Sequence, residues 1–288
     1  MVVNIDNYIM FVRNKKREKI LVTGSSGFIG SNLIKRIKKL DPICLINKNK
    51  LKIKNIKKIN LNLNDKKKIK EIFKEINPDV IFHFAALTNP RKNEKNKIYS
   101  RKLNYNFNKS LINLIQKKET HLIFLSTDKV YNGKIKNPDE KIDTSPIGIY
   151  ARLKRQSELL FIKNIKKIHI LRLPIVHGFG ISSNSFIDFA IKKIKNKKKV
   201  YLANNVFRCF VDIEQLVYFL KQLINDKNYG IYNVGSNCTS YFDRVKQLCI
   251  AKNLHYEKYL FSEKITAKPY RQELNTKKLK SVFNFNFD

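Results

Sequence analysis

The chain has 288 residues, and 59 lysines and arginines against 23 acids give it a formal net charge of +36. This excess suggests a nucleic-acid partner, but 43% hydrophobic residues are too many for a disordered basic tail. The lysines are spread along the whole chain, and no zinc-finger, basic-zipper or RNA-recognition motif accompanies them. We therefore expect a globular protein with a lysine-rich surface and no nucleic-acid partner.

The sequence also argues against a membrane protein, a secreted protein and a metal-binding protein. No stretch approaches the roughly 18 apolar residues that a membrane helix needs. The short apolar patch at 8–12 precedes its basic residues, which is the wrong order for a secretory signal. The four cysteines lack Cys-x-x-Cys spacing, so we expect neither a zinc site nor a disulfide framework. The interpretation is a cytoplasmic protein with no membrane partner and no metal.

Strands and helices are expected to alternate along most of the chain, because short apolar runs exchange with apolar residues at helical spacing. The expected strands cover 19–23, 43–46, 58–63, 79–84, 121–126, 167–173 and 229–234. The expected helices cover 28–40, 66–76, 99–116, 147–163, 186–195, 213–224 and 241–251, with Asp212 and Gln215 as a capping box for the sixth. Beyond the last of these helices the chain is expected to be irregular.

This alternation predicts an α/β fold, with a Rossmann-type doubly wound parallel sheet and a smaller C-terminal substrate-binding lobe. Residues 1–18 are interpreted as an N-terminal extension. The nucleotide-binding core is expected to take 19–173 and a returning segment, 206–234. The lobe is expected to take 174–205 and 235–288.

A glycine-rich turn lies between the first expected strand and the first expected helix. Gly24, Gly27 and Gly30 have the spacing Gly-x-x-Gly-x-x-Gly. The first permits a tight turn, the second lets a pyrophosphate approach the backbone, and the third lets the helix close on the strand. The free amides of the helix start then hold the anion. The neighbours expected to contact the cofactor with them are Ser26, Phe28 and Ile29.

The form of the cofactor depends on the residues after the second strand. NAD specificity usually needs an Asp or Glu there, to bind the ribose hydroxyls. The stretch 47–52 contains no acid, and Lys48 could pair with a 2′-phosphate. The sequence therefore favours NADP and leaves NAD open.

A tyrosine and a lysine four residues apart form the expected catalytic set with a threonine. Tyr150 and Lys154 share a helix face, and Thr127 ends the preceding strand. A nearby ammonium is expected to lower the pKa of the phenol. Thr127 would hydrogen-bond a substrate carbonyl, and the tyrosine would protonate it as a nicotinamide gives it hydride.

These motifs resemble the extended short-chain dehydrogenase/reductase family, also called the NAD-dependent epimerase/dehydratase superfamily. Asn62-Leu63 stands where the family has an Asp-Leu pair beside the adenine, and His83-Phe84-Ala85-Ala86 matches its His-x-Ala-Ala. Asn104 matches its helix-start Asn. The cofactor contacts that the resemblance implies are Asn62, Leu63, Phe84, Ala85, Ala86, Asn104, Tyr150 and Lys154.

The stretch from Ser126 to Gly133, together with Glu158 and the 274–279 segment, is similar to the dTDP-4-dehydrorhamnose reductase branch. The resemblance implies reduction of the C4 keto group of a 4-keto-6-deoxy nucleotide sugar, in deoxysugar supply for surface polysaccharide. The substrate contacts that it implies are Thr88, Asp128, Val130, His177, Arg208, Lys268 and Arg271. Lys268 stands where the branch has an arginine, and lysine cannot make a bidentate phosphate contact.

Two other functions stay open. A nucleotide-sugar 4,6-dehydratase or epimerase of the same family would use an acid/base pair after the threonine, where this chain has Asp128-Lys129. A non-catalytic nucleotide-binding subunit would often lack Tyr150 or Lys154, which are both present. The interpretation also allows a homodimer.

Overall fold

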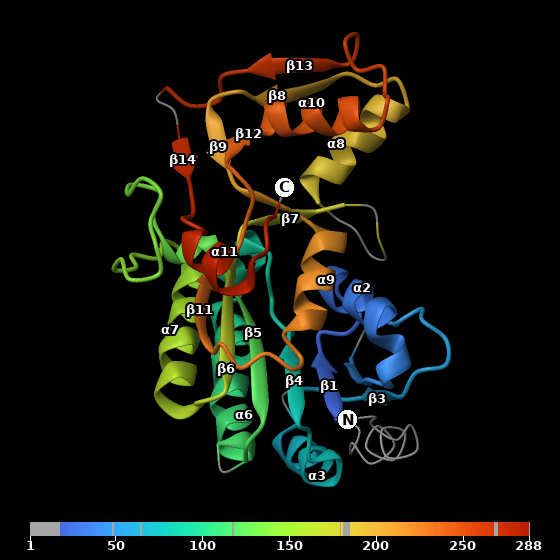
Figure 1. The fold of residues 1–288 in the computed structure, drawn as a ribbon, viewed down its shortest axis with the longest axis vertical. Coiled ribbons are helices and arrows are strands. Elements are labelled where there is room, and N and C mark those ends of the chain that lie inside the picture. Colours follow the sequence, from blue (N-terminus) through green and yellow to red (C-terminus); the bar gives the residue numbers. More distant parts are fainter. Residues whose placement is uncertain are drawn as a thin grey trace, which may run out of the picture.

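The computed structural model describes residues 18–47, 49–63, 65–116, 118–178, 180, 185–267 and 270–287, and this part of the chain contains a sheet of seven parallel strands. Their order is β11-β6-β5-β4-β1-β2-β3 (Figure 1). The strands are β1 (Ile20–Thr23), β2 (Ile43–Ile46), β3 (Lys58–Asn60), β4 (Val80–His83), β5 (His121–Thr127), β6 (Ile168–Leu173) and β11 (Gly230–Asn233). The predicted doubly wound α/β fold is confirmed. The strand order reverses between β1 and β4, the place where such sheets bind ligands.

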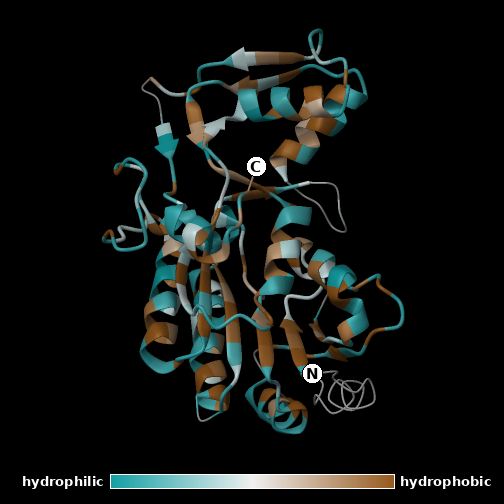
Figure 2. Ribbon diagram, viewed as in Figure 1, coloured by the Kyte–Doolittle hydropathy of each residue, from teal (hydrophilic) through white to brown (hydrophobic). Residues whose placement is uncertain are grey.

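Helices cover both faces of this sheet, because successive strand residues point to opposite sides. Ile20 and Val22 belong to one hydrophobic core, and Leu21 between them belongs to the other. The first core includes α2 (Phe28–Ile37), α9 (Ile213–Gln222) and α11 (Lys277–Phe283), and the second includes α3 (Lys66–Ile76), α6 (Phe107–Ile115) and α7 (Ile149–Asn164). Figure 2 shows the apolar strands enclosed by helices with polar outer faces.

A smaller lobe lies beyond the carboxyl ends of the strands (Figure 1). Its elements are α8 (Phe186–Lys195), α10 (Tyr241–Ala251), β8 (Val200–Ala203) paired with β13 (Leu260–Glu263), and β9 (Val206–Arg208) between β12 (Thr239–Ser240) and β14 (Tyr270–Gln272). Between body and lobe, β7 (Ile175–His177) pairs with β10 (Phe210–Asp212). The segment 206–234, predicted to belong to the core, begins with β9, which pairs with β12 and β14 in the lobe. The chain therefore returns to the body only after β9.

One expected helix is longer and less regular than its apolar spacing predicts. Helical structure begins at Pro90 rather than near Tyr99, and it consists of α4 (Pro90–Lys95), α5 (Lys97–Arg101), the π-helical turn η2 (Lys102–Asn106) and α6. Asn89 and Asn96 cause the early starts, because their side chains accept hydrogen bonds from the amides of α4 and α5. The final stretch is also more ordered than expected, since it contains β13, β14 and α11. Among the described residues, no helix is both long and apolar enough to cross a membrane.

The sequence predicts no disulfide framework, but the described part of the chain contains one disulfide. Cys209 and Cys238 form a disulfide, while Cys44 and Cys249 are free and buried. The antiparallel register of β9 and β12 pairs Arg208 with Thr239, so the next position along brings the two cysteines together. This pairing is set by a sheet of the lobe, and the spacing of cysteines along the chain does not reveal it.

Candidate active site

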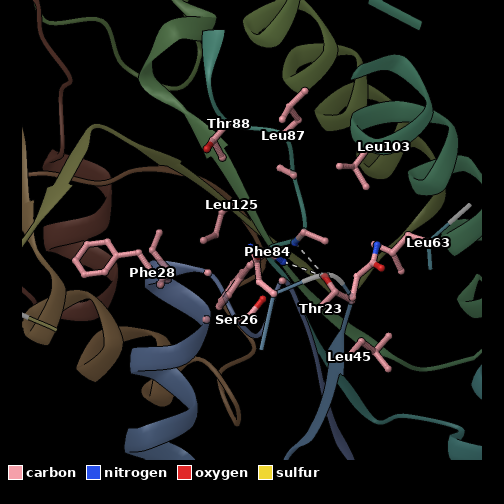
Figure 3. A pocket seen from close by; sticks show the side chains of 18 of the residues that line it. Thr23, Ser26, Phe28, Leu45, Leu63, Phe84, Leu87, Thr88, Leu103 and Leu125 are labelled. Atoms are coloured by element: carbon pink, nitrogen blue, oxygen red, sulfur yellow. Dashed lines mark hydrogen bonds between the residues drawn. The ribbon is translucent and has the colours of Figure 1, made fainter. Parts of the chain in front are cut away.

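A cavity of about 780 Å³ lies at the carboxyl ends of β1, β4 and β5 (Figure 3). Most of the predicted cofactor residues line it, together with the predicted catalytic set. The predicted residues in its wall are Gly24, Ser26, Gly27, Phe28, Ile29, Gly30, Asn62, Leu63, Phe84, Ala85, Ala86, Thr88, Thr127, Tyr150 and Lys154. Positions from five separate stretches of the chain therefore meet in one place.

The glycine turn forms one wall of this cavity. Gly24 has φ +68°, and a Cβ added to it would lie 2.6 Å from the amide nitrogen of Ala85. A Cβ on Gly30 would collide with the Gly24 carbonyl oxygen. Gly27 is the N-cap of α2 and has no side chain to occupy the first amides, and the first turn carries no acid. This helix start can therefore hold an anion, such as a pyrophosphate.

A hydrogen-bonded junction fixes the strand ends beneath the cavity. The Thr23 hydroxyl oxygen accepts from the amides of Phe84 (3.2 Å) and Ala85 (3.1 Å), as Figure 3 shows. The same oxygen lies 2.7 Å from Nδ1 of His83, whose Nε2 lies 2.8 Å from Oδ1 of Asn108. Burial lowers the pKa of His83 to about 3, so the ring is neutral. Thr23 therefore donates to Nδ1, and Nε2–H donates to Asn108.

Asn104 does not line the cavity among the described residues, although it was predicted to contact the cofactor. Its side-chain oxygen accepts from the Leu87 amide at 2.8 Å, and its nitrogen donates to the Leu87 carbonyl and to Asn93 Oδ1, both at 3.1 Å. Leu87 and Thr88 do line the cavity. Asn104 therefore acts on the cavity through the loop that it holds.

The predicted catalytic residues lie together, but their electrostatics differ from expectation. Lys154 Nζ donates to the Leu125 carbonyl at 2.7 Å and lies 4.3 Å from the centre of the Phe124 ring. Burial lowers the pKa of Lys154 from 10.5 to about 7, with partial opposition from Glu158.

The predicted direction for the tyrosine is wrong. The pKa of Tyr150 is raised, first by burial and then by the Asp128 carboxylate. A lysine whose ammonium donates to a backbone carbonyl, and which is itself partly neutral, does not offset these two effects. The phenol is therefore protonated at neutral pH.

The predicted substrate residues other than Thr88 do not line the cavity among the described residues. Arg208 donates to Asp128 at 2.6 Å, which links β9 of the lobe to the end of β5. Nε of Arg208 is buried and has no hydrogen-bond partner in the described part of the chain. Arg271 pairs with Glu273 at 2.9 Å.

Two further predicted contacts are buried. Val130 is fully buried in a small cluster with Tyr131, Cys209 and Leu274, so its side chain faces a core. His177 accepts from Arg244 at 3.0 Å, and its pKa is lowered to about 4, mainly by burial. Lys48 and Lys268 lie outside the described residues.

Sequence reasoning missed several residues of the cavity wall. The unpredicted ones are Thr23, Leu45, Ile46, Asn47, Asn49, Leu61, Leu87, Lys92, Tyr99, Leu103, Leu125, Ser126, Leu173, Pro174 and Val176. Thr23 and Ser126 could have been found, because each ends a strand beside a motif residue. Lys92 lies on α4, a short helix for which periodicity gives no signal, and Tyr99 lies at the start of the expected 99–116 helix, where nothing in the sequence marks it as part of the site.

Comparison with known proteins agrees with this geometry. The family model described as "RmlD substrate binding domain" matches residues 18–285. An ADP-L-glycero-D-manno-heptose-6-epimerase of Brachyspira hyodysenteriae is 26% identical over 258 residues, 80% of each chain.

Two solved structures share the fold. A dTDP-4-dehydrorhamnose reductase from Bacillus anthracis in complex with NADP has 20% identity and a TM-score of 0.81, over 95% of each chain. A UDP-glucose 4-epimerase of Thermotoga maritima with UDP-glucose has 19% identity and a TM-score of 0.80, over 94% of each chain. Since the family model spans both the glycine turn and the lobe, the chain belongs to the RmlD substrate binding domain family.

Proposed function

We propose that this protein reduces the C4 keto group of a 4-keto-6-deoxy nucleotide sugar with NADPH or NADH. The observation that carries the proposal is that Thr127 and a protonated Tyr150 line the same cavity as the glycine turn. The similarity to a dTDP-4-dehydrorhamnose reductase supports the same reaction. A cytoplasmic location, a homodimer and a role in deoxysugar supply for surface polysaccharide stay predictions.

The cavity fits a dinucleotide cofactor. Gly24, Gly27 and Gly30 leave the space that a pyrophosphate needs, and a Cβ at Gly24 or Gly30 would collide with backbone. Asn62 and Leu63 would contact the adenine. Asn47 and Asn49 line the cavity after β2, where no acid is available for an NAD ribose, so NADP is favoured. When bound, the reduced nicotinamide supplies a hydride.

The side chains supply the proton and the orientation. The Thr127 hydroxyl would donate a hydrogen bond to the substrate carbonyl, and it now donates to Asp128 at 3.2 Å. The Tyr150 O–H would break as its proton moves to the oxygen at C4. Lys154 would hold the cofactor ribose and then stabilise the phenolate that remains.

The protonated state of Tyr150 suits reduction. A reductase needs the tyrosine as an acid, and a protonated phenol is ready to donate. A 4,6-dehydratase or an epimerase that first oxidises a C4 hydroxyl would need the phenolate as a base. Asp128, the acid that a dehydratase would use, is paired with Arg208 in this structure.

Arg208 is the proposed contact for the substrate diphosphate, because its buried Nε has no partner among the described residues. A guanidinium can bind phosphate oxygens in pairs. Arg271 and Lys268 would assist from the same lobe. Thr88 would contact the sugar from the cavity wall.

The test uses purified protein, NADPH or NADH, and a panel of 4-keto-6-deoxy nucleotide sugars, followed by nicotinamide absorbance. Consumption of the reduced cofactor, with a 4-hydroxy product, is expected. A 4-keto or epimerised product from a 4-hydroxy nucleotide sugar, without net change of cofactor, would instead identify a dehydratase or an epimerase. Cofactor binding with no turnover of any of these substrates would support a non-catalytic subunit.

A further inference from the structure

The helix that carries Tyr150 begins without a capping side chain of its own. The N-cap of α7 is Gly148, with φ +84°. The carboxylate of Glu94, from α4, takes the place of a cap: its Oε1 accepts from the Ile149 amide at 2.7 Å. A Cβ on Gly148 would lie 3.3 Å from the same oxygen, so the carboxylate is packed against the helix start. An acceptor with negative charge stabilises such a helix end.

Glu94 is itself held by the loop that lines the cavity. Asn89 caps α4 by accepting from the Lys92 amide at 3.0 Å. Asn93, next to Glu94, is fully buried, and its side chain donates to the carbonyls of Leu87 (2.8 Å) and Asn89 (2.7 Å). The short helix therefore connects the cavity loop to the first turn of α7.

We propose that Glu94 is a positioning residue, which fixes the start of α7 and thereby the direction of the Tyr150 phenol; the proposal rests on the proposed function. Tyr150 is the second residue of α7, within the turn that frays when a helix loses its cap. Glu94 acts by geometry, because the charge found to raise the pKa of Tyr150 is that of Asp128. Losing the bond to Ile149 would move the phenol relative to Thr127 across the cavity.

Three substitutions separate the bond from the charge. Glu94→Ala removes the acceptor, and kcat is expected to fall about 10- to 100-fold, because small displacements of a reacting group have effects of this size. The side chain in Glu94→Asp is one methylene shorter and does not reach the Ile149 amide, so kcat should fall by a similar factor. Glu94→Gln keeps an oxygen that can accept from Ile149, so kcat should stay within about threefold of the wild type. KM for the cofactor should not change in any of them.

The matched control is Glu71→Ala, which removes an exposed glutamate on α3 and should leave kcat unchanged. The proposal is overturned if Glu94→Ala keeps full kcat, or if Glu94→Gln loses as much activity as Glu94→Ala. It is also overturned if thermal melts show that a larger fraction of unfolded protein accounts for the whole loss of kcat in Glu94→Ala.

Hydrogen exchange gives a readout that does not need turnover. Amides of the 149–152 segment should exchange faster in Glu94→Ala than in the wild type or Glu94→Gln. If the wild type reduces no 4-keto nucleotide sugar, the proposed function fails, while this exchange pattern still tests the cap. Unchanged exchange at the start of α7 would overturn the cap even in an active enzyme.

Discussion

Replacing Lys154 by methionine should make the protein more stable at neutral pH while it abolishes turnover. The Lys154 side chain is 3% exposed, and burial lowers its pKa from 10.5 to about 7. A pKa change of that size corresponds to about 5 kcal/mol against the charged form in the folded state. Methionine has a similar length and carries no charge, so Lys154→Met removes this unfavourable free energy.

The gain is reduced by the contacts that the ammonium makes. Its hydrogen bond to the Leu125 carbonyl contributes about 1.5–3 kcal/mol, and its contact with the Phe124 ring about 0.5–2 kcal/mol. A net gain of up to about 3 kcal/mol remains. For a chain of this size, each kcal/mol raises Tm by roughly 2–4 °C.

The pH dependence of the stability difference tests whether the buried charge of Lys154 causes it. Lys154 loses its proton near pH 7 in the folded chain and near pH 10.5 in the unfolded chain. Between these values the unfolded chain binds more protons, so this lysine makes wild-type stability rise with pH. The advantage of Lys154→Met should be greatest below about pH 7, and it should shrink and then reverse as the pH rises toward about 10.5, because the wild type gains about 5 kcal/mol over this interval.

Thermal unfolding of both proteins at about pH 6, 8 and 9.5 measures this difference. Lys163→Met, on the exposed end of the same helix, is the control and should change Tm little at any of these pH values. A methionine variant that is less stable than the wild type at pH 6, or an advantage that does not vary with pH, would show that the buried charge of Lys154 does not destabilise the folded chain.

Three further substitutions test other parts of the site. Gly24→Ala places a Cβ 2.6 Å from the Ala85 amide nitrogen at φ +68°, so it should lower the unfolding free energy by about 1–3 kcal/mol. Fluorescence titrations should show no cofactor binding by this variant, and normal binding would contradict the role of the turn. Glu158→Ala leaves the buried Arg172 guanidinium without its carboxylate, so urea titrations should show an unfolding free energy lower by about 3–5 kcal/mol. A loss under about 1 kcal/mol would show that the ion pair is dispensable for stability. Tyr150→Phe should lower kcat at least about 100-fold with unchanged cofactor Kd, and full activity would exclude it as the proton donor.

Much of the body could be predicted from the sequence, because its strands are continuous apolar runs and its helices are amphipathic. The bounds predicted for β2, α3, α8 and α10 agree with the structure. The short strands β9 and β12 of the lobe were not predicted, since their pairing depends on partners distant in the sequence. The disulfide between Cys209 and Cys238 was missed for the same reason.

In the candidate site, too, features set by local sequence could be predicted, and features set by contacts between distant residues could not. The glycine turn, Thr127, Tyr150 and Lys154 could be placed together, because the carboxyl ends of parallel strands meet at one edge. The direction of the Tyr150 pKa could not be predicted, since it depends on burial and on Asp128. The pairing of Asp128 with Arg208 joins residues 80 positions apart, and neither residue alone indicates it.

The net charge of +36 contributes little to the cavity itself. Among the described residues that line it, the cations are Lys92 and Lys154, and burial brings the pKa of Lys154 to about 7. Under the proposed function, the backbone amides at the start of α2 would hold the pyrophosphate, and no substitution of a surface lysine removes them. Fixed dipoles in a partly enclosed cavity are screened less by salt than exposed charges are. Under the proposed function, we expect recognition of the pyrophosphate to depend on the three glycines, and the lysine-rich surface to act mainly on the rate at which anions arrive.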